Sequence, residues 1–238
     1  MVELIKSSER HLSSMGWLKS YFLFSFADYY DPNNIQFGPL RVFNDDYIAA
    51  KSGFPMHPHS DMEIVTIVLK GAITHKDSIG NEKVITAGEV QRMTAGTGLT
   101  HSEQNSGDEE LHLYQLWFFP NRKGLQPSYE QKKLDFLDSS NELIPLVTGQ
   151  KVLDDVVYMN NNSTVYYANL HEEKEIDFKT FKIRKTFIYV TEGSFFINGQ
   201  EVNKEDQLRL SEQEIIKIRA AKTGSFILID VPALEANY

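Results

Sequence analysis

The chain has 238 residues, of which 41% are hydrophobic and 24% are charged, the composition of an ordinary globular protein. Its formal net charge of -9 argues against nucleic-acid binding through a generally positive surface. Because the chain contains no cysteine, disulfides, thiol catalysis and thiolate metal ligands are excluded, and any metal must be held by nitrogen and oxygen. We therefore expect a cytoplasmic protein that forms one large or two small domains.

The N-terminal part of the chain predicts short strands joined by turns. An aromatic run at residues 21–27 favours a strand and is far too short to span a membrane. Residues 38–50 predict another strand, which runs into the turn-forming residues Asn44, Asp45 and Asp46. We expect Arg41, Asn44 and Asp45 in a solvated loop, with the mouth of a pocket as the alternative.

Further along the chain, the same strand signal recurs. Runs rich in β-branched and aromatic residues, separated by turns, lie at residues 62–80, 82–96, 111–120, 165–170, 187–202 and 214–231. The Asn198-Gly199 pair is a strong hairpin signal, and only residues 127–141 contain a plausible short helix. Many short strands with little helix favour an all-β fold of closed barrels or jelly rolls, and two such units fit the length.

Three of the seven histidines stand at positions where their side chains can meet. Side chains alternate along a strand, so His57, His59 and Glu63 are expected to share one face. His101 and Glu103 share a face of a later segment in the same way. If the two segments lie side by side in one barrel, imidazoles and a carboxylate converge there. Such a set predicts a metal site with one or two open positions on an octahedral ion.

An internal repeat is indicated by two turn glycines. Gly71 of the segment VLKG matches Gly193 of the segment VTEG. Under this alignment the second half has lysine and phenylalanine where the first half has His57 and His59. If the halves are duplicated barrels, the second has lost its metal ligands, and we expect one site per chain.

Two motifs carry a resemblance to a known family. The pattern G-x3-HxH-x3-E-x7-G, which starts at Gly53, and the pattern G-x9-G-x2-H-x3-N, which starts at Gly88, resemble the two halves of the cupin motif. The segments HPHSDMEIVT, THKDSIGN, GEVQRMTAGTGLTHSEQN and FSFADYYDP resemble the pirin branch of that superfamily. The chain is also similar in length to the short bacterial pirin-like quercetinases.

This resemblance implies a bicupin, in which two jelly-roll barrels pack together. An N-terminal cupin domain at residues 1–134 would carry the metal site, and a C-terminal cupin-like domain at residues 135–238 would lack metal ligands. It also implies one divalent metal ion per chain, expected to be Fe(II), with Mn, Co, Ni, Cu or Zn as alternatives.

Spacing alone does not decide which glutamate completes the metal site, because Glu63 and Glu103 are both expected to point inward. Ordinary cupins use the first position and pirin-like members use the second. The resemblance therefore implies the metal ligands His57, His59, His101 and Glu103. Glu63 is then expected to be an interior carboxylate held by hydrogen bonds, with a proton acceptor as the alternative. The two glutamates are the candidates for a catalytic role.

The resemblance to quercetinase-type pirins implies a metal-dependent dioxygenase that cleaves flavonols such as quercetin with O2 and releases carbon monoxide. This quercetin 2,3-dioxygenase activity would make the chain an oxidoreductase. The alternative is a non-enzymatic iron-binding regulatory protein that acts through protein contacts. We expect a small aromatic substrate and O2 as partners, no direct nucleic-acid binding, no membrane association and a monomeric state.

Other side chains of chemical interest are expected to have structural roles. His75 lies beside charged residues in a hairpin, so a surface position or a hydrogen bond is expected rather than metal ligation. His112 is expected on the exterior, because alternation places it opposite its apolar neighbours. The candidates for pocket walls are Phe54, Met93, Gln115 and Trp117.

Overall fold

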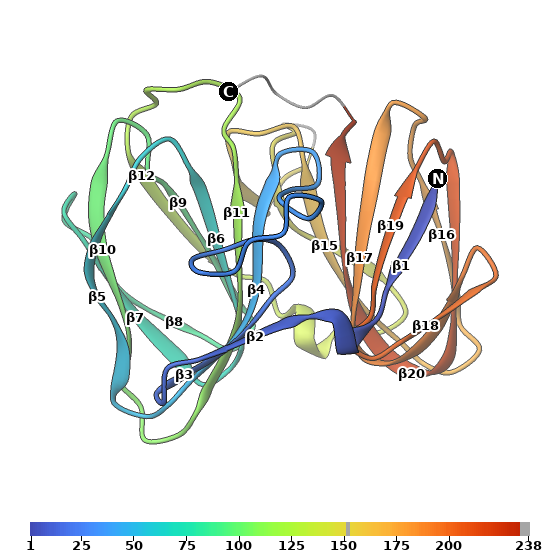
Figure 1. Ribbon diagram of the computed structural model, residues 1–238, viewed down its shortest axis with the longest axis horizontal. Helices are drawn as coiled ribbons and strands as arrows, with labels where there is room; N and C mark the ends of the chain where they lie inside the picture. Colours follow the sequence, from blue (N-terminus) through green and yellow to red (C-terminus); the bar gives the residue numbers. More distant parts are fainter. Residues whose placement is uncertain (151–152, 234–238) are drawn as a thin grey trace.

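The computed structural model describes residues 1–150 and 153–233, and it contains two β-barrels side by side (Figure 1). Among these residues, helical structure is limited to the short 3-10 turns η1 (Ser7–Glu9) and η2 (Phe136–Asp138). The predicted all-β fold of two packed barrels is confirmed. Residues 234–238 of the predicted second domain lie outside the described residues.

The first barrel consists of a seven-stranded sheet and a four-stranded sheet. In spatial order, the large sheet contains β12 (Ser128–Lys133), β9 (Glu89–Thr94), β6 (Glu63–Lys70), β11 (Leu111–Phe118), β4 (Leu40–Ile48), β3 (Leu18–Phe22) and β2 (His11–Ser14). The small sheet contains β5 (Ser52–His59), β10 (Leu99–Asn105), β7 (Ala72–Asp77) and β8 (Glu82–Thr86).

The second barrel is one nine-stranded sheet. Its main path contains, in spatial order, β1 (Val2–Ile5), β19 (Gln207–Ser211), β17 (Arg184–Ile197), β20 (Ile215–Pro232), β15 (Thr164–Leu170), β13 (Leu143–Thr148) and β14 (Val157–Tyr158). Off this path, β16 (Glu175–Lys179) pairs with β20, and β18 (Gln200–Asn203) pairs with β17. The long strands β17 and β20 each pair with different partners along their length, so each contributes to two walls of the barrel.

The two barrels share one strand order, which supports the predicted internal repeat. The path β12-β9-β6-β11-β4-β3 of the first barrel corresponds to β1-β19-β17-β20-β15-β13 of the second. Gly71 separates β6 from β7 and Gly193 lies within β17, and both glycines have a positive φ, of 81° and 74°. The place of β12 is taken in the second barrel by β1, so the first strand of the chain completes the barrel formed by its last strands. The domain division at residue 134 stays a prediction.

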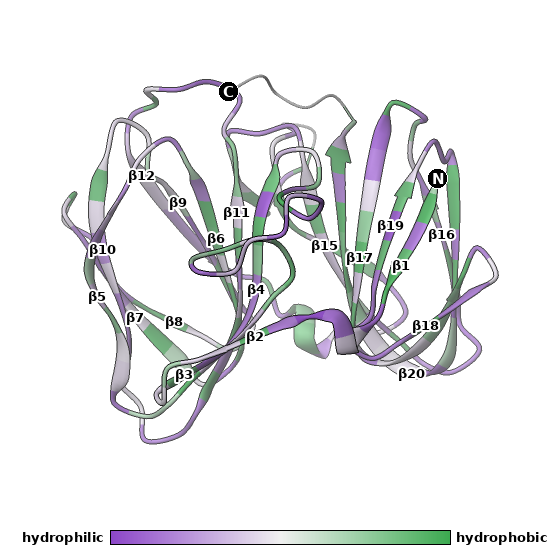
Figure 2. Cartoon of the chain, in the orientation of Figure 1, coloured by the Kyte–Doolittle hydropathy of each residue, from purple (hydrophilic) through white to green (hydrophobic). Residues whose placement is uncertain are grey.

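Alternation along the strands of the large sheet sends side chains into two environments. On β11, Tyr114 and Leu116 face the second barrel, where they join a buried cluster with Phe187 and Tyr189. The intervening Gln115 points to the opposite face and lines the interior of the first barrel. Hydrophobic and hydrophilic stretches accordingly alternate along the strands of both barrels (Figure 2).

The interiors of the two barrels differ in chemistry. The second barrel encloses an apolar core that includes Phe195, Ile197, Ile216 and Ile218. The first barrel has buried polar side chains on the inner faces of both of its sheets, among them His75, Asp77, Gln91, His101, Glu103, Asn44 and Asp46. The second barrel therefore has an ordinary apolar core, whereas the first combines an apolar cluster, which includes Val68, Ile73 and Leu113, with polar groups that need partners.

Two local predictions need correction. The short helix predicted within residues 127–141 is confined to the 3-10 turn η2, and the first part of the range forms the strand β12. The turn predicted at Asn44, Asp45 and Asp46 is instead the middle of β4, where all three side chains are buried. Neighbouring strands override the turn preference of these residues, because β4 is paired along both of its edges.

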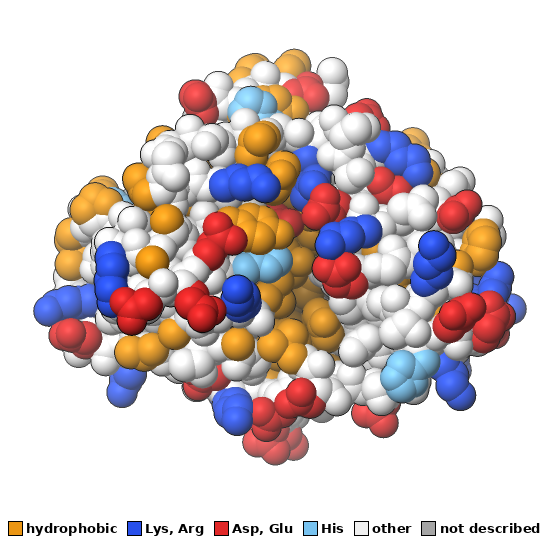
Figure 3. Space-filling model, turned by 90° about the horizontal axis from the view of Figure 1, so that it is seen from below, with side chains coloured by type: hydrophobic (Ala, Val, Ile, Leu, Met, Phe, Trp, Pro, Cys, Tyr) orange, Lys and Arg blue, Asp and Glu red, His pale blue; other side chains and the backbone are white. Residues whose placement is uncertain are grey.

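Within the described ranges no helix is long and apolar enough to cross a membrane. Seen from below, hydrophobic side chains gather in a hollow near the seam of the two barrels, and charged side chains surround it (Figure 3). The seam continues inward as the buried cluster shared by both barrels.

The contact between the barrels predicts a large effect of one aromatic side chain. Phe187 is fully buried and its ring lies 5.7 Å from the ring of Phe43 in the first barrel. Phe187→Ala is expected to lower the free energy of unfolding by about 3–5 kcal/mol, because it leaves a cavity between the barrels. Urea unfolding measures the change. Phe181→Ala, at a side chain that is 69% exposed, is the control and should have a small effect; equal effects of the two variants would contradict the packing.

Candidate metal centre

The predicted histidine cluster forms where two strands of the small sheet pair. β5 and β10 are antiparallel, and His101 lies opposite His57. The register shifts between His101 and Glu103, so that Glu103 lies opposite Phe54 and β5 carries one extra residue. This β-bulge changes the alternation of β5, and the side chains of Phe54 and His57 both line one pocket.

Three imidazoles meet at this point. One ring nitrogen from each of His57, His59 and His101 lies within 4.8 Å of the other two. The ring centroids are 4.8 Å apart for His57 and His59, 4.4 Å for His57 and His101, and 4.9 Å for His59 and His101. His101 is buried and the other two are half-buried, so the cluster has a dry side and a side open to a pocket.

Two of these imidazoles, those of His59 and His101, are neutral at neutral pH. Burial is the main cause that lowers the pKa of His59 to about 4 and the pKa of His101 to about 3, and neighbouring imidazoles lower both pKa values further. The Nε2 atoms of His59 and His101 are buried and have no hydrogen-bond partner among the described residues. Neutral imidazoles with unpaired nitrogens are suited to bind a cation, so these residues fit a divalent metal ion.

Glu103 lies next to the cluster on its buried side. Its carboxylate accepts a hydrogen bond from Nε2 of Gln115 at 2.9 Å and a longer one from Oγ1 of Thr66 at 3.4 Å. A carboxylate oxygen of Glu103 groups within 4.8 Å with nitrogens of His75 and His101. The structure thus brings the three predicted histidine ligands together, and it places Glu103 beside His101 in a second group that shares that residue.

A buried carboxylate and a fourth histidine stand behind His101. Oδ2 of Asp77 lies 3.1 Å from Nε2 of His75, and Nδ1 of His75 lies 3.5 Å from Nδ1 of His101. If His75 carries its proton on Nε2 and donates it to Asp77 in a hydrogen bond, its Nδ1 is free to accept a hydrogen bond from Nδ1 of His101. In this arrangement His101 is protonated on Nδ1 and has its lone pair on Nε2, the atom without a hydrogen-bond partner. This is the tautomer that can bind a metal ion through Nε2.

The surface position expected for His75 is wrong, because the residue is fully buried within the small sheet. The hydrogen bond expected for His75 is confirmed by its contact with Asp77. His112 does lie on the face of β11 opposite Gln115, but it is not simply exterior. Its Nε2 lies 2.7 Å from a carboxylate oxygen of Asp45, and its ring stacks on Tyr47.

Glu63 does not join the cluster. Asp61 has a φ of 48°, so the chain turns between β5 and β6 and the alternation of one strand does not continue into the other. The carboxylate of Glu63 faces the second barrel and accepts a hydrogen bond from the backbone N–H of Asn160 at 3.0 Å. The expectation that Glu63 points to the same interior as Glu103 is wrong, whereas the expected hydrogen bonding of its buried carboxylate is confirmed. Burial raises its pKa; a catalytic role for Glu63 stays a prediction.

A pocket of about 230 Å³ opens on the cluster. Of the residues predicted as pocket walls, Phe54, Gln115 and Trp117 line it, together with His57, His59 and Glu103. The ring of Trp117 meets the ring of His59 edge-on at a centroid distance of 4.8 Å. Met93 instead packs in a small buried apolar cluster. The cluster is therefore accessible to a small molecule through a chamber whose walls include the rings of Phe22, Phe26, Phe54 and Trp117.

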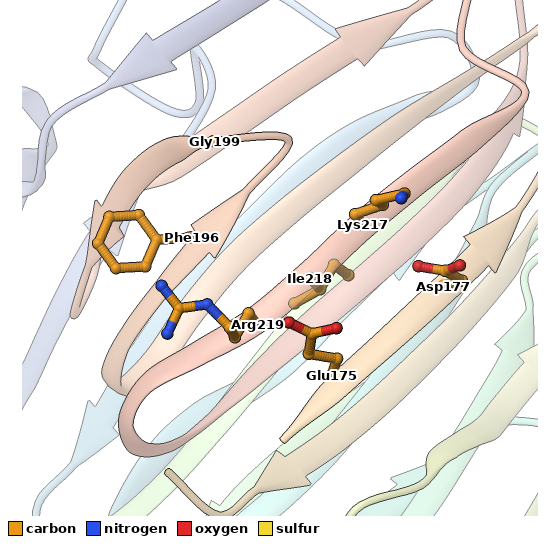
Figure 4. Close-up of a pocket in the computed structure, with 7 residues that line it drawn as sticks. All are labelled: Glu175, Asp177, Phe196, Gly199, Lys217, Ile218 and Arg219. Atoms are coloured by element: carbon orange, nitrogen blue, oxygen red, sulfur yellow. The ribbon is translucent and has the colours of Figure 1, made fainter. Parts of the chain in front are cut away.

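A hollow on the second barrel has a different character. It lies on the outer face of β16 and β20, where Glu175 is paired with Arg219 and Asp177 with Lys217 across the strands (Figure 4). Arg219 also lies over the ring of Phe196 at 4.7 Å. Most of the charged side chains here are exposed, and Arg219 forms its ion pair with Glu173, so a solvated charged surface accounts for the hollow.

The position of the two glutamates predicts their effect on metal content. Glu103→Ala is expected to weaken metal binding by roughly tenfold or more, because it removes the carboxylate beside His101. Glu63→Ala is the matched control, since it removes a second buried glutamate that faces away from the cluster. Elemental analysis after dialysis measures the metal content of each variant. Metal retained by Glu103→Ala and lost by Glu63→Ala would reverse the assignment.

The lowered pKa of His59 predicts a pH dependence of the metal-free protein. Below pH 6.5 the unfolded chain protonates this imidazole, whereas the folded chain keeps it neutral down to about pH 4. The free energy of unfolding of the metal-free protein therefore decreases, through His59, as the pH falls from about 6.5 to 4. Asp46, whose pKa burial raises to about 7, acts in the opposite direction, so the effect is read from a variant. His59→Gln is expected to lose less stability than the unsubstituted chain on acidification, as thermal unfolding in chelator will measure; parallel profiles would contradict the burial of a neutral His59.

Comparison with known proteins places the chain in a family. The family model "Pirin" matches residues 5–118, and the model "Quercetinase C-terminal cupin domain" matches residues 146–231. A protein named quercetin 2,3-dioxygenase from Escherichia coli K12 is 40% identical over 233 residues, which cover 98% of this chain and 99% of the relative. A pirin-like protein from Caulobacter vibrioides is 39% identical over 215 residues, covering 90% and 93%.

A solved structure has the same fold along the whole chain. The bacterial pirin YhhW from Escherichia coli, in complex with nickel(II), superimposes with a TM-score of 0.93 at 38% sequence identity and covers 98% of this chain and 100% of its own. Sequence similarity over nearly the full length and the common fold agree with the motifs around the histidine cluster. The chain belongs to the pirin family of the cupin superfamily.

Proposed function

We propose that this chain is a metal-dependent dioxygenase that cleaves flavonols such as quercetin with O2. The observation that carries the proposal is the opening of the histidine cluster on to a pocket with aromatic walls. Such a pocket suits a flat aromatic substrate that presents an oxygen to the cluster. The name of the relative from Escherichia coli, quercetin 2,3-dioxygenase, supports the same reaction class.

In this proposal His57, His59, His101 and Glu103 hold one divalent metal ion. Fe(II) is the expected ion, with Mn, Co, Ni, Cu or Zn as alternatives. When bound, such an ion supplies a Lewis acid and a template that orients the reactants, and it can take part in redox chemistry with dioxygen.

The residues of the pocket supply binding and proton transfer. The rings of Phe22, Phe26 and Trp117 line the chamber, hold a flat ligand and exclude water from the cluster. Glu103 is the pocket carboxylate beside the cluster, and its hydrogen bond with Gln115 fixes one of its oxygens. Glu103 is therefore placed to accept the proton of the 3-hydroxyl of a flavonol, a role that Glu63 would have to perform from outside the pocket.

Turnover with defined metals tests the proposal. The metal-free protein is reconstituted with each candidate ion and mixed with quercetin in air. We expect the absorbance of the flavonol to decrease and carbon monoxide to be released. His59→Ala should lose at least about 99% of this activity, since it removes a ligand and a wall of the pocket. His171→Ala, at an exposed histidine of the second barrel, is the matched control and should remain active. No turnover with any ion would overturn the proposal and favour the metal-binding regulatory protein.

A further inference from the structure

The large sheet of the first barrel carries a row of polar side chains opposite the histidine cluster. The strand register places Gln115 of β11 beside Thr66 of β6 on one side and beside Asn44 of β4 on the other. Gln115 and Thr66 both donate to the carboxylate of Glu103. Asn44 is one strand further from that carboxylate. Its side chain is only 4% exposed, and its Oδ1 has no hydrogen-bond partner among the described residues.

Asp46 continues this polar surface along β4. Alternation sends Asn44 and Asp46 to the inner face, whereas Asp45 faces the second barrel and accepts a hydrogen bond from Tyr189 at 2.8 Å. Asp46 is 3% exposed, and its carboxylate accepts a hydrogen bond from the hydroxyl of Ser20 on β3. Burial raises the pKa of Asp46 to about 7. We call the pair Asn44 and Asp46 the β4 ledge.

The β4 ledge borders the pocket that opens on the cluster. Asn44 and Asp46 line this pocket together with His57, His59 and Glu103. The walls include donors such as Gln115, whose amide nitrogen donates to Glu103, and no donor among the described residues reaches the free oxygen of the Asn44 amide. A buried acceptor without a partner is unfavourable, and a ligand that brings a donor removes that penalty.

The chemistry of the β4 ledge selects the kind of ligand group. An amide oxygen and a carboxylate both accept hydrogen bonds, and a second carboxylate, that of Glu103, lies in the same pocket. Carboxyl groups on two strands and an amide oxygen offer acceptors rather than positive charge, which disfavours anionic groups such as phosphate or carboxylate. A neutral hydroxyl of an aromatic ring satisfies the ledge, because it donates a hydrogen bond without bringing charge.

We propose that the β4 ledge binds a hydroxyl group of an aromatic ligand that is distinct from the group presented to the histidine cluster. The inference rests on the proposed function and narrows the substrate class to flavonols that carry hydroxyls on their outer rings in addition to the 3-hydroxyl. Such a ligand is held at two points, which fixes its orientation in the aromatic chamber.

A pair of ligands tests the ledge without catalysis. Quercetin and 3-hydroxyflavone share the 3-hydroxyl, and only quercetin has hydroxyls on its outer rings. Their dissociation constants for the metal-loaded protein are measured under nitrogen by fluorescence titration. Quercetin is expected to bind roughly tenfold more tightly, as a hydrogen bond to a buried acceptor predicts. Equal affinities, tighter binding of 3-hydroxyflavone or no binding of either ligand would overturn the inference.

Variants locate the effect on β4. Asn44→Leu and Asp46→Leu remove the acceptors with little change in volume, and each is expected to bring the ratio of the two dissociation constants close to one. Asp177→Leu is the matched control, because Asp177 is an exposed carboxylate on the outer face of the second barrel, outside the pocket, and its loss should leave the ratio unchanged. Thermal unfolding shows whether each variant folds. If a variant does not fold, the inference is judged from the dissociation constants of the two ligands for the unsubstituted chain. An unchanged ratio in both folded β4 variants would overturn the assignment.

Turnover in air separates this inference from the proposed function. Cleavage of quercetin together with equal affinities for the two ligands would overturn the ledge and leave the dioxygenase proposal standing. A tenfold preference that depends on Asn44 and Asp46, without cleavage by any metal form, would support the ledge and overturn the dioxygenase proposal.

Discussion

Two buried imidazole nitrogens without a partner set the constraint on which the first barrel depends. Nε2 of His59 and Nε2 of His101 lie in a site that burial keeps neutral, with pKa values of about 4 and 3. A buried polar atom that lacks a hydrogen bond is unfavourable, so the fold tolerates this arrangement only where a ligand completes it. The β-bulge in β5 and the contact of His75 with His101 both orient the rings toward that shared point.

The two barrels divide the tasks of stability and chemistry. The second barrel has an apolar interior, and the interface between the barrels is a large apolar cluster that contains side chains from both. These cores add hydrophobic stabilisation to that of the smaller apolar clusters in the first barrel, whose interior also holds histidine, carboxylate and amide groups. The outer face of the large sheet is thus an integral part of the core, while its inner face is free to carry a polar row. Glu63 and Glu103 show the division clearly, because one serves the interface and the other the pocket.

The two barrels have the same strand order but different interiors. This is expected for two copies of a repeated unit when only one copy keeps its metal-binding residues. The positions on the path β12-β9-β6-β11-β4-β3 have counterparts along β1-β19-β17-β20-β15-β13, yet apolar side chains such as Ile216 and Ile218 fill the second barrel. In the second barrel the position of β12 is occupied by β1, so the first strand of the chain pairs with β19 near its end. Fold alone therefore does not determine function here; the side chains on the inner faces do.

The sequence by itself determined the fold class, the repeat and the three histidines. Short strands, turn glycines and the spacing of His57, His59 and His101 are local patterns, and local patterns survive folding when the neighbours agree with them. The assignment of faces was less secure, because alternation holds only within one strand. The turn at Asp61 sends Glu63 to the other barrel, a change that no periodicity across residues 57–63 reveals.

Only the tertiary structure decided which polar residues surround the site. Asn44 and Asp46 have turn preferences in isolation, and pairing of β4 with β3 and β11 makes them buried acceptors of the pocket. His75 has the sequence environment of a surface hairpin, yet the closure of the small sheet buries it behind His101. The physical reason is the same in both cases: register and barrel closure bring together residues distant in sequence, and the environment of a polar side chain is set by those distant neighbours.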